Sequence, residues 1–294
     1  MRTSDLPFKP SRPFAVRLST AALAAAGLLG GTAHADVRPD PGDYTGLPAG
    51  TDLALVYAQF PRADKVYANG KKVVDNLDLS VNAGILRYVH FMKLGDYIID
   101  PQIIMPFGSQ KIGLSDSKAS GIGDVIFGGT LWTIADLARG EHLGWSVFFT
   151  APTGSDKNQG FALSNNRWAT DLQVGYIRKL SNNWTVDLIG ETEFYQDQRD
   201  TKSQKDPLLQ AHGHLRYHLS DATYLAATYR HAWGAKETLN GAEIAGAKNN
   251  GTAMLTWASF VDKQWQVQLQ YVRDLKVEEG PKISGLQARL LYVY

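Results

Sequence analysis

Hydrophobic and polar side chains alternate one by one along most of this chain. In the clearest run, residues 209–219, one face carries leucines, a tyrosine and small residues, while the other carries Gln210, His212, His214, Arg216 and His218. A two-residue period predicts a β-strand, because successive side chains of a strand point to opposite faces of its sheet. Twelve such strands are predicted, at 52–61, 76–91, 96–107, 122–135, 142–152, 167–180, 184–196, 207–219, 222–233, 250–261, 264–275 and 284–294.

The connections between these strands alternate in length. Short connections are predicted at 92–95, 181–183, 220–221 and 262–263, and longer ones at 61–75, 108–121, 153–166, 196–206 and 234–249. Transmembrane barrels sort their connections in this way, with tight turns on the periplasmic side and longer loops outside. The pattern therefore predicts an all-β, up-and-down antiparallel transmembrane barrel of about twelve strands, and Pro106 and Gly108 are expected to end the third strand.

The first residues of the chain are typical of an export signal. A basic leader is followed by the apolar run 19–29 and by Ala33-His34-Ala35, a small-x-small cleavage pattern. We therefore predict a signal peptide at 1–35, a Pro/Gly-rich leader at 36–51 that lies in the periplasm or the lumen, and the barrel at 52–294. No later segment has about eighteen consecutive apolar residues, so no transmembrane helix is predicted.

Composition narrows the class of partner. The chain has 30 basic and 29 acidic side chains, and removing the four basic and one acidic of the signal leaves 26 and 28, so no basic surface for nucleic acid is expected. Cysteine is absent, which excludes a disulfide framework and thiolate chemistry. No cofactor is predicted.

Aromatic residues cluster near the predicted short turns. Eight of them fall on the apolar face at one rim, as in the girdle of a membrane barrel: Tyr97, Trp145, Tyr176, Trp184, Tyr217, Trp265, Tyr292 and Tyr294. The chain stops inside a strand at Tyr294, and a terminal strand ending in an aromatic resembles the signal by which outer-membrane barrels are recognised by the assembly machinery. The expected partners are therefore outer-membrane lipid, that machinery and a small-molecule solute.

The polar face must be hydrated, because so many charges in a dry core would cost too much free energy. We predict that it lines the lumen and sets selectivity through Asp187, Glu191, Glu193, His212, His214, Arg216, His218, Arg230 and Arg289. The acids precede the histidines by one strand, so ion pairs with Arg216 and His214 are expected. His212 and His214 share a face and could chelate a metal, but a hydrated wall of mixed donors accounts for them better, and no metal site is predicted.

Three short motif groups connect the chain to a family. They are PGDY at 41–44 with LPAGT at 47–51, GIGD at 121–124, and APTG at 151–154. Together they resemble the outer-membrane β-barrel family of phenol meta-pathway degradation proteins, whose members are described as transporters. The resemblance implies a barrel linked to hydrophobic or aromatic carbon sources and supplies no catalytic residues.

The function predicted from these observations is an outer-membrane channel or transporter for small compounds, aromatic or hydrophobic ones among them, and not an enzyme. A structural or assembly barrel is the second interpretation. A membrane-embedded lipid hydrolase is the third, and it would need a serine, a histidine and an orienting group together on the outward face. The glycines at 121, 123, 128 and 129 lie in a strand pattern with no following helix, so they do not indicate a nucleotide loop.

Overall fold

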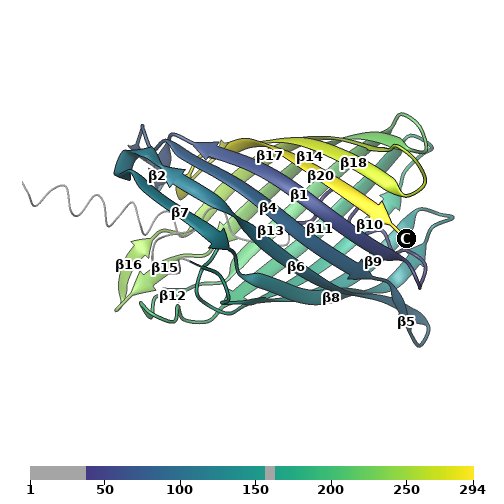
Figure 1. Ribbon diagram of the computed structural model, residues 1–294, viewed down its shortest axis with the longest axis horizontal. Coiled ribbons are helices and arrows are strands. Elements are labelled where there is room, and N and C mark those ends of the chain that lie inside the picture. Colours follow the sequence, from purple (N-terminus) through teal and green to yellow (C-terminus); the bar gives the residue numbers. More distant parts are fainter. Residues whose placement is uncertain (1–37, 156–162) are drawn as a thin grey trace, which may run out of the picture.

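Twelve long strands form one barrel in the computed structural model, which describes residues 38–155 and 163–294 (Figure 1). The predicted signal peptide and its cleavage site lie outside these residues. Each long strand pairs antiparallel with the long strands before and after it, which confirms the up-and-down order. The long strands are β1 (Asp52–Ala63), β4 (Leu79–His90), β6 (Tyr97–Ile112), β8 (Val125–Asp136), β9 (Glu141–Ala151), β10 (Ala169–Lys179), β11 (Trp184–Tyr195), β13 (Leu208–His218), β14 (Thr223–Gly234), β17 (Lys248–Phe260), β18 (Trp265–Lys276) and β20 (Ser284–Val293).

The first and last strands close the sheet on itself. β1 pairs with β20 from Leu53 opposite Val293 to Arg62 opposite Ser284. At the rim, the Asp52 amide donates to the Tyr294 carbonyl at 2.9 Å, and the Tyr294 amide donates to the Asp52 carbonyl at 3.1 Å. Closure leaves no open sheet edge, which is the condition for a β-structure in lipid.

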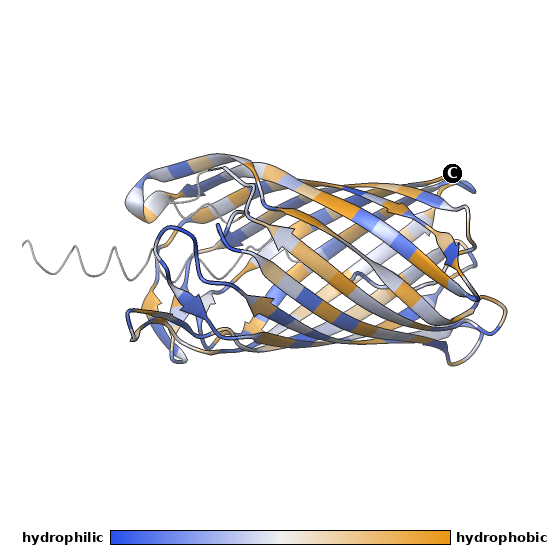
Figure 2. Ribbon diagram, turned by 90° about the horizontal axis from the view of Figure 1, so that it is seen from below, coloured by the Kyte–Doolittle hydropathy of each residue, from blue (hydrophilic) through white to orange (hydrophobic). Residues whose placement is uncertain are grey.

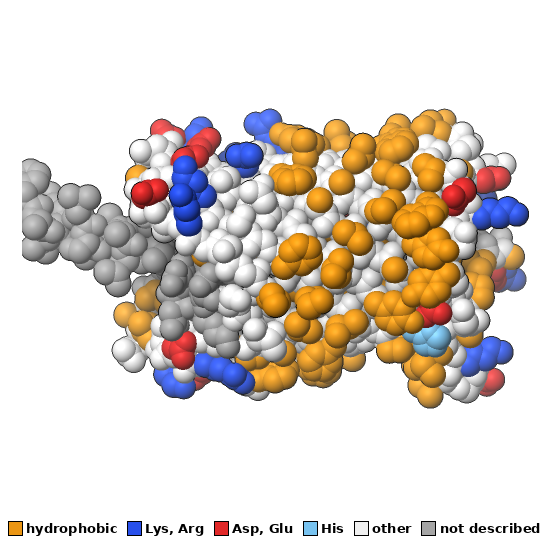
Figure 3. Space-filling view, viewed as in Figure 1, with side chains coloured by type: hydrophobic (Ala, Val, Ile, Leu, Met, Phe, Trp, Pro, Cys, Tyr) orange, Lys and Arg blue, Asp and Glu red, His pale blue; other side chains and the backbone are white. Residues whose placement is uncertain are grey.

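The outward face is apolar and forms a broad band around the barrel (Figures 2 and 3). Leu255 and Leu286, on neighbouring parts of this band, are 65% and 62% exposed. Such exposure suits contact with lipid chains. The described ranges contain no helix that is long and apolar enough to cross a bilayer.

Placing a charge on this band is expected to destabilise the barrel. Leu255→Arg should lower the free energy of unfolding by about 2–4 kcal/mol, the cost of an arginine near the bilayer midplane. The control is Gln287→Arg, whose side chain faces the interior cavity. Urea titration of both variants in lipid vesicles, followed by tryptophan fluorescence, measures the difference. Equal stability of the two variants would contradict the assignment of the lipid face.

Aromatic rings line the end of the barrel with the short turns. Trp184 packs against Tyr217 with ring centroids 4.8 Å apart, and Trp265 packs against Tyr292 at 4.6 Å. Tyr294, the last residue, is 54% exposed and stacks on Tyr292. These rings form the predicted girdle at the turn-bearing rim.

One strand end differs from the prediction. β6 does not end at residue 107 but continues to Ile112 and forms a hairpin with β7 (Ser117–Ile122). Pro106 is tolerated inside β6 because β6 pairs with β8 only up to Ile104 and with β7 only from Phe107, so no ladder donor is needed at the proline. A proline thus marks a change of neighbour here and not the end of a strand.

The remaining short elements lie at the ends of the barrel. β5 (Met92–Leu94) extends the turn between β4 and β6, and the 3₁₀ turn η1 (Gly113–Ser115) connects β6 to β7. The long connections at the opposite end carry two small sheets. These sheets consist of β2 (Val66–Ala68), β3 (Lys71–Val74) and β19 (Gly280–Pro281), and of β12 (Gln204–Lys205), β15 (Glu237–Leu239) and β16 (Ala242–Ala245).

Candidate functional site

The described part of the leader, residues 38–51, lies inside the barrel. Its backbone bonds directly to the wall: the Gly42 amide donates to Asp187 Oδ2 at 2.7 Å, and the Pro41 carbonyl accepts from the Tyr224 hydroxyl at 2.8 Å. Nearer the turns, the Gly46 amide donates to His142 Nδ1 at 3.2 Å. The leader therefore follows the interior from the start of β1 toward the loop end.

Two leader carboxylates meet arginines and glutamines of the wall. Asp40 accepts from Gln268 Nε2 at 3.0 Å and from Gln270 Nε2 at 2.9 Å. Arg289 Nη1 bridges both acids, at 3.2 Å from Asp40 and 2.9 Å from Asp43. Arg87 Nη1 adds a second bond to Asp43 at 2.9 Å. Several ionised partners on one short segment make this the strongest anchor of the leader.

Burial and charge act differently on the two acids. Burial raises the pKa of Asp40 and outweighs the opposing effect of Arg289. Burial also works against ionisation of Asp43, but Arg87 and Arg289 together outweigh it and lower the pKa of this carboxyl. The two arginines therefore favour the ionised form of Asp43.

Tyr44 supplies a second anchor, because its ring packs against a glycine of the wall. Its hydroxyl bonds to Ser146 Oγ and donates to Gln173 Oε1, both at 2.8 Å. Its ring fills the space above Gly175, where an added Cβ would lie 2.2 Å from ring carbons of Tyr44. The side chain is buried at 5% exposure. Wall and leader thus fit each other at this point.

Among the described residues, two of the interior cavities lie on opposite sides of the leader anchor. The loop-side cavity has a volume of about 110 Å³ and borders leader residues 38–40. The turn-side cavity has a volume of about 250 Å³ and borders leader residues 41–43, 45 and 47. Arg87 lines both cavities, so the leader anchor lies between them.

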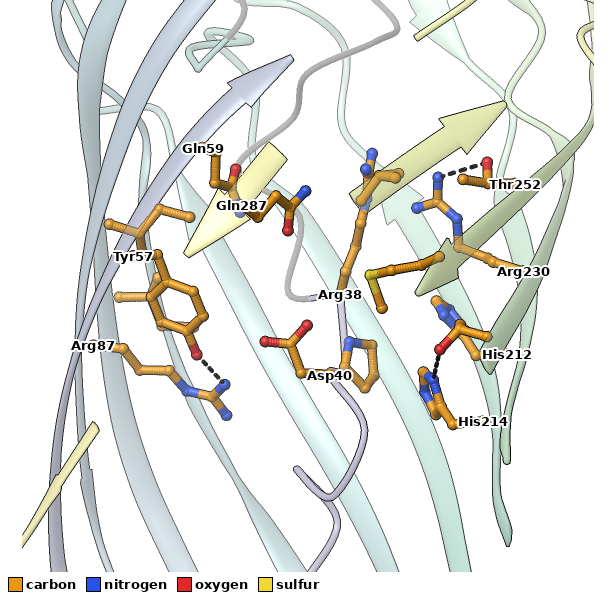
Figure 4. A pocket seen from close by; sticks show the side chains of 16 residues that line it. Arg38, Asp40, Tyr57, Gln59, Arg87, His212, His214, Arg230, Thr252 and Gln287 are labelled. Carbon is orange, nitrogen blue, oxygen red and sulfur yellow. Dashed lines mark hydrogen bonds between the residues drawn. The ribbon is translucent and has the colours of Figure 1, made fainter. Parts of the chain in front are cut away.

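The walls of the loop-side cavity have different characters. Figure 4 shows Asp40 between a wall with Tyr57 and Arg87 and a wall with His212, His214 and Arg230. Leader and wall together contribute three arginines and two histidines to the lining, and one carboxylate. Apolar side chains complete it: Ile85, Ile104, Met254 and Val272. The cavity therefore offers cationic donors beside an apolar surface.

The structure places all nine residues predicted for the lumen on the inward face. His212, His214 and Arg230 line the loop-side cavity, and Arg216, His218 and Arg289 line the turn-side cavity. The three acids are buried in the wall on β11: Asp187 at 1%, Glu191 at 4% and Glu193 at 7% exposure. Their role in selectivity stays a prediction.

The predicted ion pairs form with one change of partner. Arg216 donates to Asp187 Oδ1 from Nε at 3.0 Å and from Nη2 at 2.8 Å. Glu191 pairs with His212 at 3.0 Å and accepts from Gln210. His214 lies directly opposite Asp187 in the register, but its Nδ1 bonds to Thr228 Oγ1 instead. In the described residues, no three His, Asp or Glu side chains are arranged to hold a metal ion.

Several interior residues were missed from the sequence. Asp40, Asp43 and Tyr44 belong to the leader, which has no period to show which way its side chains point. Arg87 faces inward on β4, a strand whose inward positions are otherwise mostly apolar, such as Val81 and Val89. The one available signal was the PGDY motif at 41–44, which contains Asp43 and Tyr44.

A histidine was also missed on the outer wall. His231 on β14 accepts or donates at both ring nitrogens, with the Tyr229 hydroxyl at 2.9 Å and Asn249 Oδ1 at 2.7 Å. Asn249 thus orients the His231 ring, as a lipid hydrolase would require. The other ring nitrogen, however, bonds to the Tyr229 hydroxyl, where such an enzyme would have its serine. The three inward histidines of β13 do not reach the outer face. Neither hydrogen-bond partner of His231 is a serine, so this histidine does not support the hydrolase interpretation.

Comparison with known proteins identifies the family. The family model described as "Putative MetA-pathway of phenol degradation" matches residues 63–290. The chain belongs to this family. It is also similar to the COG4313 outer membrane channel from Pseudomonas putida F1, with 33% identity, a TM-score of 0.83, and coverage of 87% of this chain and 100% of that one. No curated protein matches the chain.

The fold alone is shared more widely. The transport unit of the autotransporter AIDA-I from Escherichia coli matches with a TM-score of 0.50 and 10% identity, covering 92% of this chain and 96% of that one. The predicted family, barrel and location are thus confirmed: this member of the phenol-degradation family is an outer-membrane β-barrel.

Proposed function

We propose that the protein is a passive channel that carries small compounds, aromatic or hydrophobic ones among them, across the outer membrane. The observation that carries the proposal is the interior itself, a closed barrel that keeps two lined cavities in series on either side of the leader. The similar protein from Pseudomonas putida F1 is an outer membrane channel, which supports the same activity for this chain.

The lining supports the proposed solute class. Ile85, Ile104 and Val272 give a solute ring an apolar wall, and the arginines and histidines opposite suit its polar or anionic substituents. An apolar cavity of about 150 Å³ is known to hold one benzene molecule. The turn-side cavity of about 250 Å³ is therefore large enough for a single substituted ring, whereas the loop-side cavity of about 110 Å³ is smaller than such a site.

Liposome swelling tests the proposal. Vesicles containing the refolded mature protein should admit small aromatic acids and alcohols faster than sugars of the same size, because only the former use the apolar wall. Protein-free vesicles are the baseline. A folded barrel that leaves the vesicles as impermeable as this baseline, with the leader present and with it deleted, would overturn the channel proposal.

The charge of the loop-side cavity leads to a prediction about ions. With three arginines against one carboxylate in the lining, the channel should prefer anions, and Arg230→Gln should reduce the anion-to-cation permeability ratio. The matched control is Arg178→Gln, because Arg178 is an exposed arginine outside both cavities. Reversal potentials in a potassium chloride gradient measure the ratio. The same ratio in both variants would show that Arg230 does not set it.

A further inference from the structure

A row of basic and hydroxyl side chains crosses the outer wall. Neighbouring strands place its six members directly opposite one another, from Lys118 on β7 to Lys111 on β6, Ser80 on β4, Arg62 on β1, Ser284 on β20 and Arg273 on β18. Five of them have the outward parity because their chain neighbours Ala119, Gln110, Leu79, Ala63 and Val272 are buried, and Ser284 shares it because it lies directly opposite Arg62. We call these six residues the basic row.

The basic row lies where the apolar band ends. Arg62 follows Asp52 by ten residues on β1, which at about 3.4 Å per residue and a tilt of about 40° puts it about 26 Å from the turn-side rim. The lipid-facing band of such barrels is about 25 Å tall. Basic side chains gather at this loop-side edge in Figure 3. Arg62 therefore borders the outer leaflet, and Lys111, fourteen residues after Tyr97 on β6, lies further toward the loops.

Half of the row borders a depression in the outer wall. It has a volume of about 400 Å³ and is lined mainly by hydroxyl, amide and ammonium groups of β4, β6 and β7. The outward residues in it are Ser80, Asn82, Ser109, Lys111, Lys118 and Ser120. A polar hollow on a surface that otherwise contacts lipid chains is suited to a headgroup.

The charges of the row are not balanced from within the protein. Lys111 and Lys118 stand directly opposite each other, which is unfavourable for like charges. In the described ranges, none of the four cations forms an ion pair within 4 Å. Asp274, the chain neighbour of Arg273, is buried, and the nearest exposed acids along these strands, Asp64, Asp78 and Asp116, come on the loop side of the row. On the membrane side the next outward residues are uncharged.

We infer that the basic row and its depression bind the phosphorylated headgroup of a lipid in the outer leaflet. Phosphate oxygens would accept from Arg62 and Arg273 on either side of the Ser284 hydroxyl, and from the two lysines, whose mutual repulsion a bound anion relieves. The acyl chains of the same lipid would lie on the apolar band below, along Phe60, Leu286 and Tyr271. This surface is separate from the interior and does not depend on the channel proposal.

Native mass spectrometry with purified lipid A tests the inference. The probes are lipid A with its phosphates and the same lipid after removal of the phosphates. The test variant combines Arg62→Gln, Lys111→Gln, Lys118→Gln and Arg273→Gln. The matched control removes four exposed cations at the turn side instead, as Lys93→Gln, Arg139→Gln, Lys179→Gln and Lys263→Gln. Heat-modifiable migration on gels shows that each barrel is folded.

The test variant should bind phosphorylated lipid A at least about tenfold more weakly than the wild type, while the control variant should match the wild type. Phosphate-free lipid should bind the wild type as weakly as it binds the test variant. The conductance of the test variant should be unchanged. Equal binding of phosphorylated lipid A to both variants, no dependence on the phosphates, or full displacement of the lipid by inorganic phosphate would each overturn the inference.

Discussion

Deletion of residues 36–46 should raise the single-channel conductance several-fold, because leader residues 38–46 lie between the two cavities and, on the channel proposal, narrow the path. The deletion removes Asp40, Asp43 and Tyr44 and keeps Leu47 to Thr51, which lead into β1. The path that remains is then limited by the wall alone. Planar bilayer recordings of the refolded protein measure the change.

The deletion also removes the carboxylate that pairs with two arginines of the wall. Arg87 and Arg289 lose Asp43, and the buried Asp187 loses the Gly42 amide. A second variant, Asp40→Asn with Asp43→Asn, keeps the chain length and weakens only the charged anchor. We expect it to show frequent opening steps between the wild-type level and the level of the deletion. Wild-type conductance in both folded variants would rule out the leader as the constriction.

Gly175→Ala should loosen the leader almost as strongly, through a single methyl group. The added Cβ would lie 2.2 Å from the Tyr44 ring, which must then leave its place above the wall. Overpacking of this kind costs about 1–3 kcal/mol. Such a cost shifts the ratio of docked to undocked leader about 5- to 150-fold. The open fraction in single-channel records should rise accordingly.

The same hairpin of the barrel offers a matched control. Gly190 lies on β11 beside β10 and faces outward, and a Cβ added there would approach Val174 Cγ1 no closer than 3.7 Å. Gly190→Ala should therefore leave the open fraction unchanged. A second check is Tyr44→Phe in the wild-type background, which keeps the ring and removes the bonds to Ser146 and Gln173. If Gly175→Ala and Gly190→Ala behave alike, Tyr44 does not hold the leader in place.

The barrel could be predicted from the sequence because one face of each strand contacts lipid and the other contacts water. Because of this contrast, segments such as 209–219 alternate between apolar and polar residues. All twelve long strands lie close to their predicted positions. The prediction was least accurate where the contrast fades. The end of β6 was placed at 107 instead of Ile112, because its last residues pair with β7 beyond the apolar band.

The interior could be predicted only in part. The wall residues of β11 and β13 were found because parity alone decides which side they face. The leader has no parity, so the contacts of Asp40 and Asp43 with Arg289 could not be derived from spacing, and they join residues more than 240 positions apart. The partner of His214 was also missed, since Thr228 on the next strand competes with Asp187 for the imidazole.

The central claim is that neighbouring residues of one strand face lipid and an aqueous interior in turn. Because the chain has no cysteine, single spin labels can be placed at Leu286 and Gln287 of β20 without a background. In vesicles, the label at position 287 should be accessible to a water-soluble nickel complex and the label at 286 to oxygen dissolved in lipid. The same accessibility profile at both positions would contradict the account.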